Sequence, residues 1–251
     1  MTSPARSAPV LSADVAVALD ALADLAREAF AVVDTIAEAT LRQLEIVDPP
    51  RRSMLRGIDA LTVDLVEHHS ELVQGAGFVS AVGLFEDAPW WLEWFARDDD
   101  KVQRLLVQTD PQGGGFYDYE NLPWYVVARD TGRRHVTGPY VDYLCTEDYT
   151  LTFTTPLAVR DAFVGVAGCD VRVNAAEERL LPALRRADSR LVVLNAHGRI
   201  IASNSGRHVC GDLVEEVDIA AAWAAPESAR GSLPALHRLD DLPLGVLELD
   251  R

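Results

Sequence analysis

The sequence predicts an α+β protein, in which long N-terminal helices precede two lobes built on antiparallel sheets. Near the N-terminus, apolar residues recur at alternating four- and three-residue spacings, as in amphipathic helices. From residue 77 the period changes to two, which is typical of half-buried strands. A smaller segment then repeats the scheme. We therefore expect a helical stalk at 1–76, a first lobe at 77–175, and a linker helix with a second lobe at 176–251.

A first helix is expected over 13–46, with Ser12 as its N-cap and Asp48-Pro49-Pro50 as its end. A second helix is expected over 53–73. One apolar seam runs along the first helix and comprises Val15, Leu19, Leu22, Ala26, Ala29, Val33, Ile36 and Thr40. About 30 residues is long for a helix that packs on a single lobe. We therefore expect the seam to lie partly on the chain's own sheet and partly in a parallel homodimer.

Six strands are expected in the first lobe, at 77–85, 90–96, 102–108, 135–143, 149–159 and 163–173. Thr150–Thr154 alternates β-branched and apolar residues, which favours a half-buried antiparallel strand. A short helix between the third and fourth strands is expected to begin near Asn121 and Pro123 and to end near Gly132. In the second part we expect helices at 175–187 and 212–224, with strands at 191–194, 199–203, 233–239 and 244–249.

Composition excludes several classes of function. The 251 residues carry a formal net charge of -16, which opposes contact with nucleic acid. Aspartates interrupt each apolar run near the N-terminus, and no segment has the length of a membrane span, so a soluble cytoplasmic protein without a membrane partner is expected. The histidines and the three cysteines show no metal-ligand spacing, and no cofactor motif occurs; neither a metal nor a cofactor is expected.

Four motifs occur in order along the first lobe: Trp124-Tyr125, Gly138–Asp142, Tyr149–Pro156 and Gly165–Val171. In this order they resemble the membrane-distal lobe of double-Cache domains, which are tandem PAS-like, PDC-type sensor domains of bacterial chemoreceptors and sensor kinases. The resemblance is close over 77–173 and extends to the remainder in layout only. It implies two PAS-like lobes, ligand binding in the first of them, and no enzymatic activity.

The amino-acid-sensing and amine-sensing members of that family provide the closest comparison. In them, an Arg-x-Trp element, a Tyr-x-Asp element and an aspartate near the end of the last strand surround the ligand. By resemblance, Trp124, Tyr140, Asp142 and Asp170 take the matching positions. Leu122 occupies the position of the arginine that serves the ligand's carboxylate. The resemblance thus implies a cationic amine or an amino-acid-like ligand, and a carboxylate anchor would have to come from Arg129, Arg133 or Arg134.

Tyr117, Tyr119 and Asp118 are further ligand-binding candidates, although Asp118 is also placed to cap the short helix. Trp90, Trp91 and Trp94 are expected to pack the hairpin instead. The leading hypothesis is a sensor that binds one ligand per chain and signals through a partner protein. Two alternatives stay open: a structural or partner-binding protein without a ligand, and an enzyme, because a nucleophile and its base need to be adjacent only in space.

Overall fold

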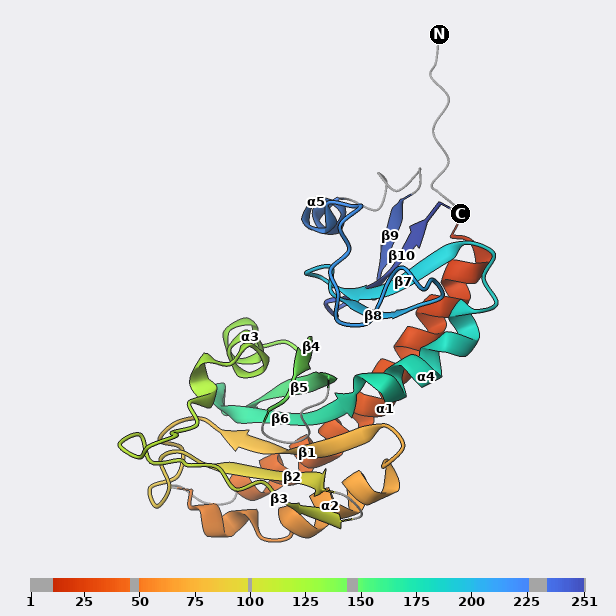
Figure 1. Cartoon of the computed structure of the whole chain (residues 1–251). Coiled ribbons are helices and arrows are strands. Elements are labelled where there is room, and N and C mark those ends of the chain that lie inside the picture. Colours follow the sequence, from red (N-terminus) through yellow and green to blue (C-terminus); the bar gives the residue numbers. More distant parts are fainter. Residues whose placement is uncertain (1–10, 46–49, 99–100, 144–148, 226–233, 251) are drawn as a thin grey trace. The chain divides into compact units, whose positions relative to one another are not determined.

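The structure is a computed structural model that describes residues 11–45, 50–98, 101–143, 149–225 and 234–250 (Figure 1). The chain forms two compact units. One comprises Ala26–Ala175, and the other comprises Met1–Leu25 together with Ala176–Arg251. These boundaries differ from the three parts expected from the sequence, because each half of the first helix is counted with a different unit and not with a separate stalk.

The unit formed by Ala26–Ala175 contains a six-stranded antiparallel sheet. Its strands lie in the order β3-β2-β1-β6-β5-β4, so β1 and β6 are central (Figure 1). The elements are α1 (Ala13–Leu44), η1 (Arg52–Leu55), α2 (Ile58–His68), β1 (Val73–Ser80), β2 (Leu92–Asp98), β3 (Lys101–Arg104), η2 (Tyr119–Asn121), α3 (Pro123–Thr131), β4 (His135–Val141), β5 (Tyr149–Val159) and β6 (Ala162–Arg172).

Helices α1 and α3 cover opposite faces of this sheet. On the α1 face, Phe153 of β5 meets Phe30 edge to face, with ring centroids 5.3 Å apart. The Cys169 thiol of β6 also donates to the Ala29 carbonyl on this face. The next residue of β5 points the other way, and the Thr154 hydroxyl donates to the Trp124 carbonyl of α3 at 3.0 Å. Asp170 follows Cys169 and therefore faces the α3 side.

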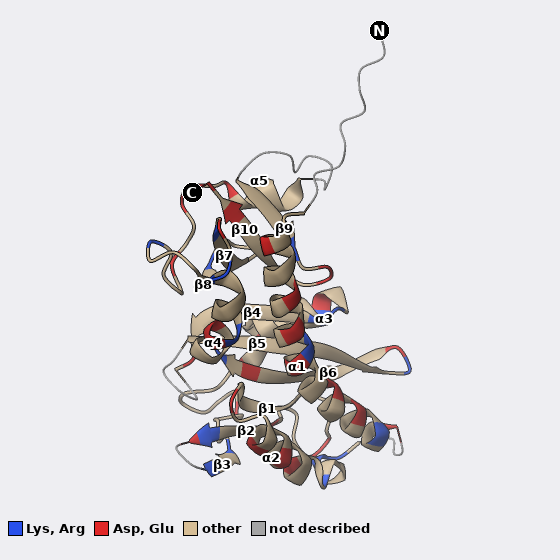
Figure 2. Ribbon diagram, turned by 90° about the vertical axis from the view of Figure 1, so that its right-hand side faces the viewer, with Lys and Arg blue, Asp and Glu red and all other residues tan. Residues whose placement is uncertain are grey.

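The apolar seam of α1 is buried within the chain itself. Val15, Leu22, Ala29, Val33 and Ile36 are each 0% exposed. These seam residues are covered by packing within the chain, so they are not free to form the expected homodimer. The length of the helix was therefore not a sound reason to expect a dimer along this seam. Asp and Glu residues occur along α1 and also along other elements of both units (Figure 2).

The second predicted helix, 53–73, is interrupted. Gly57 adopts a left-handed conformation, with φ of 86°, at the N-cap of α2. Glycine tolerates this conformation without steric strain, so the chain changes direction between η1 and α2. Helix α2 then ends at His68, and β1 begins at Val73, four residues earlier than the sequence pattern indicated.

The other unit contains a four-stranded antiparallel sheet in the order β8-β7-β10-β9. Its elements, besides the start of α1, are most of α4 (Val173–Leu184), β7 (Arg190–Asn195), β8 (Ile200–Ser203), α5 (Ile219–Ala224), β9 (Ala235–Arg238) and β10 (Leu244–Leu249). Helix α5 is shorter than the predicted 212–224 because Asp218 caps it, accepting a hydrogen bond from the Ala221 amide. Among the described residues, no helix is long and apolar enough to cross a membrane.

Candidate functional site

A cavity lies on the α3 side of the six-stranded sheet. About 350 Å³ of space lies between its lining atoms, including the part open to solvent. Its lining combines aromatic, apolar and acidic side chains: Leu92, Trp94, Leu105, Tyr117, Trp124, Tyr140, Asp142, Thr152 and Asp170. No Lys, Arg or His is found among these described lining residues.

Asp170 anchors the polar side of the cavity from the centre of the sheet. It is only 5% exposed, and the Thr152 hydroxyl of β5 donates to its Oδ1 at 2.6 Å. Thr152 is the register partner of Asp170, which explains the short distance. The Tyr140 hydroxyl lies 2.7 Å from Thr152 Oγ1. Because a threonine hydroxyl has one proton, and that of Thr152 goes to Asp170, Tyr140 donates to Thr152.

Burial raises the pKa of Asp170 from 3.8 to about 7. The hydrogen bond from Thr152 opposes this rise, the negative charge of Asp142 adds to it, and a hydrogen bond from Trp94 opposes it again. Burial also raises the pKa of Tyr140 above its ordinary value, and the charge of Asp170 contributes. The cavity thus holds two aspartates where an isolated negative charge is unfavourable, and a bound cation would relieve that cost.

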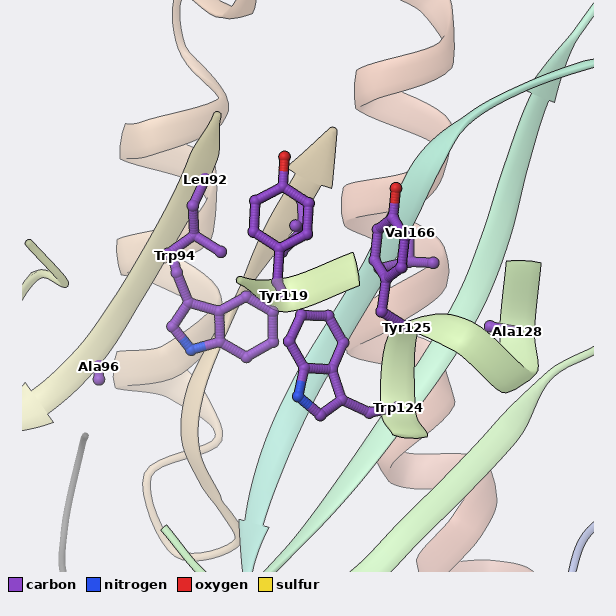
Figure 3. Close-up of a cluster of buried hydrophobic side chains, with 9 residues drawn as sticks. Leu92, Trp94, Ala96, Tyr119, Trp124, Tyr125, Ala128 and Val166 are labelled. Carbon is purple, nitrogen blue, oxygen red and sulfur yellow. The ribbon is translucent and has the colours of Figure 1, made fainter. Parts of the chain in front are cut away.

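The aromatic walls come from separate elements. Trp94 lies on β2, Trp124 lies in the first turn of α3, and Tyr117 precedes η2. Figure 3 shows the two indoles side by side, with their nitrogens on the opposite side of the cluster from the hydroxyl groups of Tyr119 and Tyr125. The hydrogen bond from Thr154 to the Trp124 carbonyl fixes the start of α3 over the sheet.

The structure brings five of the seven predicted residues together at this cavity: Tyr117, Trp124, Tyr140, Asp142 and Asp170. Tyr119 does not line it. This side chain is 0% exposed, its ring packs 5.2 Å from that of Tyr125, and its hydroxyl accepts a hydrogen bond from the Trp91 amide. Tyr119 is therefore part of the core. Its hydroxyl points away from the indole nitrogens (Figure 3).

Asp118 also lies outside the cavity lining. Its carboxylate accepts a hydrogen bond from the Asn121 side chain at 2.7 Å and makes no capping hydrogen bond to the η2 backbone. Asn121 does not cap α3 either, since the N-cap is Leu122 and Pro123 is the first helical residue. The packing of Leu122 against the aromatic cluster accounts for an apolar side chain at this position.

Sequence reasoning missed Trp94, which was expected to pack the hairpin but lines the cavity. Thr152 was also missed, although it links Tyr140 to Asp170. A signal for Trp94 was present in the sequence. Gly75, Gly77 and Gly168 lack the side chains that would otherwise occupy the sheet surface between Trp94 and Asp170.

The three arginines that could have restored a carboxylate anchor do not line the cavity. Arg134 Nη2 donates to both carboxylate oxygens of Asp34 of α1, at 2.7 and 2.8 Å. Arg129 donates to Asp130 at 2.7 Å and lies over the Tyr125 ring. Arg133 follows α3 and is exposed. The cavity keeps an excess of negative groups among its described lining residues.

Comparison with known proteins agrees with this geometry. Residues 92–177 match the family model described as the first PDC sensor domain of methyl-accepting chemotaxis protein-like proteins. No match to the sequence was found among curated proteins. The matched segment includes β2 and all of the cavity-lining residues, so the resemblance noted from the motifs is confirmed over this part of the first lobe.

Solved structures of similar fold cover nearly the whole chain. The extracellular domain assigned to the histidine kinase soHK1S-Z6 is 16% identical, with a TM-score of 0.64, over 94% of this chain and 90% of that one. The ligand-binding domain of the Campylobacter jejuni chemoreceptor Tlp3, in complex with L-norvaline, is 11% identical, with a TM-score of 0.59 over 94% and 88%.

A third similar structure is the ligand-binding domain of the Pseudomonas aeruginosa PAO1 amino acid chemoreceptor PctC in complex with GABA. It is 17% identical, with a TM-score of 0.54 over 94% of this chain and 96% of that one. The predicted α+β fold with two antiparallel-sheet lobes is thereby confirmed. Residues 92–177 thus match a PDC sensor family model, and nearly the whole chain shares the fold of the sensor domains of chemoreceptors and of a histidine kinase.

Proposed function

We propose that this sensor binds a small cationic amine in the cavity of its first lobe and signals through a partner protein. The observation that supports the proposal most directly is the pair of buried aspartates, Asp142 and Asp170, which are 8% and 5% exposed on one cavity. Carboxylates neutralise an ammonium group, and aromatic faces add cation–π attraction of about 0.5–2 kcal/mol. Trp94, Trp124 and Tyr117 supply such aromatic side chains.

Preference for an amine over an α-amino acid follows from the groups that are available for a carboxylate. By the resemblance, Leu122 takes the position of the arginine in the related sensors, and Arg134 is engaged by Asp34. An amino acid is the second candidate, favoured by the fold likeness to Tlp3 with L-norvaline and to PctC with GABA. In the proposed site its carboxylate would approach two aspartates, which is unfavourable unless a donor is supplied.

Titration calorimetry with matched pairs tests this preference. Putrescine is expected to bind more tightly than ornithine, and histamine more tightly than histidine. Tighter binding of both amino acids would overturn the amine assignment. Asp142→Asn is expected to weaken amine binding. Asp161→Asn is the matched control, because it removes the same charge from an exposed turn of the same lobe where the left-handed backbone also suits asparagine.

Binding without turnover is part of the proposal. The ligand recovered from the complex is expected to have an unchanged mass, and a product that accumulates with time would favour the enzyme alternative.

Two further expectations, a homodimer and a cytoplasmic location, are separate from the cavity. A homodimer through α1 would use exposed residues such as Val17, which is 45% exposed, and light scattering measures its mass.

The cytoplasmic location stays a prediction from the sequence. The similar kinase structure is described as an extracellular domain, and an equivalent placement is the competing possibility. Protease treatment of intact and lysed cells separates the two, because only an exposed external domain is cleaved before lysis.

A further inference from the structure

A second cavity lies within the unit that contains the four-stranded sheet. About 1100 Å³ of space lies between its lining atoms, including the part open to solvent. The lining residues come from the start of β8 and from the segment that follows it: Arg199, Ile200, Arg207, His208, Gly211, Asp212, Leu213, Glu215 and Glu216. All of them belong to the same compact unit, and none of them lines the cavity of the first lobe.

The wall of this cavity is a loop whose two ends are hydrogen-bonded together. After β8 the chain turns, and the His208 amide donates to the Ser205 carbonyl at 3.0 Å. The chain then returns beside β8: the Ile200 amide donates to the Asp212 carbonyl, and the Gly211 amide donates to the Ile200 carbonyl, both at 2.9 Å. Compact surface loops whose ends lie close together frequently carry function. The backbone hydrogen bonds therefore form the cavity without help from a ligand.

Two side chains of opposite charge are held in place at this cavity by different partners. Arg199 Nη1 donates to the Gly211 carbonyl at 2.5 Å. Glu216 Oε1 lies 3.2 Å from Nε2 of His208, which is only 6% exposed. The pKa of Glu216 lies below its ordinary value, chiefly because its own backbone amide hydrogen bonds to it, and His208 adds to the lowering. Glu216 is therefore charged at neutral pH.

These two charges do not neutralise each other. Among the ion pairs of the described residues, none joins Arg199 to Glu216, although both side chains line one cavity. Likewise, within the described part of the chain, Arg207 forms no ion pair with Asp212 or Glu215. A ligand with a single charge would be attracted by one group and repelled by the other. A ligand that carries both signs gains a charge-assisted hydrogen bond at each end.

We infer that the second lobe has a binding site of its own for a small dipolar molecule, whose anionic group meets Arg199 and whose cationic group meets Glu216. The inference goes beyond the proposed function, because it adds a second ligand to the one per chain expected from the sequence. The guanidinium of Arg199 has further N–H donors besides the one given to Gly211, and the carboxylate of Glu216 has a second oxygen that can accept. Amino acids with the two charged groups at opposite ends, the ω-amino acids, are suitable probes.

Calorimetry tests the inference with the ω-amino acids from glycine to aminohexanoate, each compared with the alkyl amine and the alkyl carboxylate of matched length. At least one ω-amino acid is expected to bind about tenfold or more tightly than both of its singly charged counterparts, because each charged end adds a hydrogen bond between charged groups. The absence of such a preference throughout the series would overturn the inference.

Asp170→Asn separates this site from the proposed amine site of the first lobe. Binding of the preferred ω-amino acid is expected to be unchanged in this variant. Loss of that binding would place the ligand in the first lobe, which overturns the second site and leaves the amine site standing. Hydrogen exchange provides the location directly: amides within 199–216 are expected to be protected by the ligand, and protection confined to β5 and β6 would contradict the inference.

Two variants test the two ends of the site separately. Glu216→Gln keeps an oxygen that can accept from His208 but loses the charge, so the ω-amino acid should bind no more tightly than the matched carboxylate. Arg199→Gln should reduce its affinity to that of the matched amine. Glu178→Gln and Arg186→Gln are the controls, because both residues are exposed, belong to the same unit and do not line the cavity. Neither control is expected to change the affinity ratios.

Circular dichroism establishes that each variant is folded before binding is compared. If Arg199→Gln does not fold because the contact with Gly211 is lost, Glu216→Gln alone decides the inference. A folded Glu216→Gln variant that still prefers the ω-amino acid over the carboxylate would show that Glu216 only supports His208, and the inference would be wrong.

Discussion

Asp170→Asn is expected to have opposite effects on stability and on binding. The folded protein holds Asp170 with a pKa of about 7, against an ordinary value of 3.8, so it binds more protons than the unfolded chain between these values. The free energy of unfolding of the ligand-free protein therefore falls as pH rises through this window. The penalty is absent below about pH 4 and complete above about pH 7. At roughly 1.4 kcal/mol per pKa unit, the full penalty is about 4 kcal/mol.

Between pH 5 and pH 8, the same relation gives an increase in this penalty of about 2–3 kcal/mol. Asparagine removes the charge but keeps an oxygen that can accept the Thr152 hydroxyl. Urea unfolding should therefore show Asp170→Asn gaining stability relative to the wild type by about that amount when the pH is raised from 5 to 8. Asp161→Asn, which changes an exposed residue, is expected to show no such gain.

Binding is expected to change in the other direction. Removing one partner of a desolvated charge pair typically costs about 2–5 kcal/mol, so Asp170→Asn should weaken amine binding by roughly 30-fold or more at pH 8. Calorimetry on the samples used for unfolding provides the comparison. A variant that loses stability equally at pH 5 and pH 8 while binding amines normally would refute the reasoning, because Asp170 would then be a structural carboxylate already neutralised by the protein.

Three further results are expected. Amine affinity in the wild type should be about tenfold weaker at pH 6 than at pH 8, because protonation of Asp170 competes with the cation; pH-independent calorimetry between these values would contradict this. Leu22→Glu should lower the free energy of unfolding in urea by about 3 kcal/mol or more, whereas Val17→Glu, at an exposed position, should not. If Leu22→Glu instead abolished a dimer without loss of stability, the seam would be intermolecular. Arg134→Gln should leave the ratio of amine to amino acid affinities unchanged in calorimetry, since its partner is Asp34, and loss of amino acid binding alone would show that Arg134 serves the cavity.

The sequence predicted the sheets better than it predicted their surroundings. The strands over Tyr149–Val159 and Leu244–Leu249 agree with the structure in both bounds. The expectation that Thr150–Thr154 is half-buried was wrong, because all five residues are buried: α1 covers one face of the sheet and α3 the other. The helix expected at 212–224 begins only at Ile219, because a local cap at Asp218 overrides a weakly amphipathic pattern.

The candidate site shows where pattern reasoning ends. Asp142 and Asp170 were named from motifs, and their position on one cavity follows from pairing between β4, β5 and β6. Tyr117 and Tyr119 could not be separated, because the orientation of neighbouring aromatic residues in a loop depends on tertiary packing. Trp94 was assigned to packing because Asp170 lies far along the chain. The glycines that leave the sheet surface between the two residues open become informative only when the strand order β2-β1-β6 is known.

The way in which α1 is divided between the compact units bears on the order in which the chain folds during synthesis. The first lobe draws on the continuous segment Ala26–Ala175, so all of its strands are available once that segment has been made. The other unit joins residues from the two extremes of the sequence: the Ser12 hydroxyl donates to Glu248, 236 positions away. It has to wait for β10, and closing so long a loop carries an additional entropic cost.

Until then, the apolar side chains at the start of α1, such as Val15, Ala18 and Leu22, lack the strands with which they share a unit. A nascent chain would pass through a stage with a complete ligand-binding lobe and an exposed apolar helix end. Exposed apolar surface of this kind is what chaperones bind and what drives aggregation of partly synthesised proteins. Ligand present during translation would therefore stabilise the early lobe but give no protection to the helix end, and truncation before residue 176 would leave that end permanently uncovered.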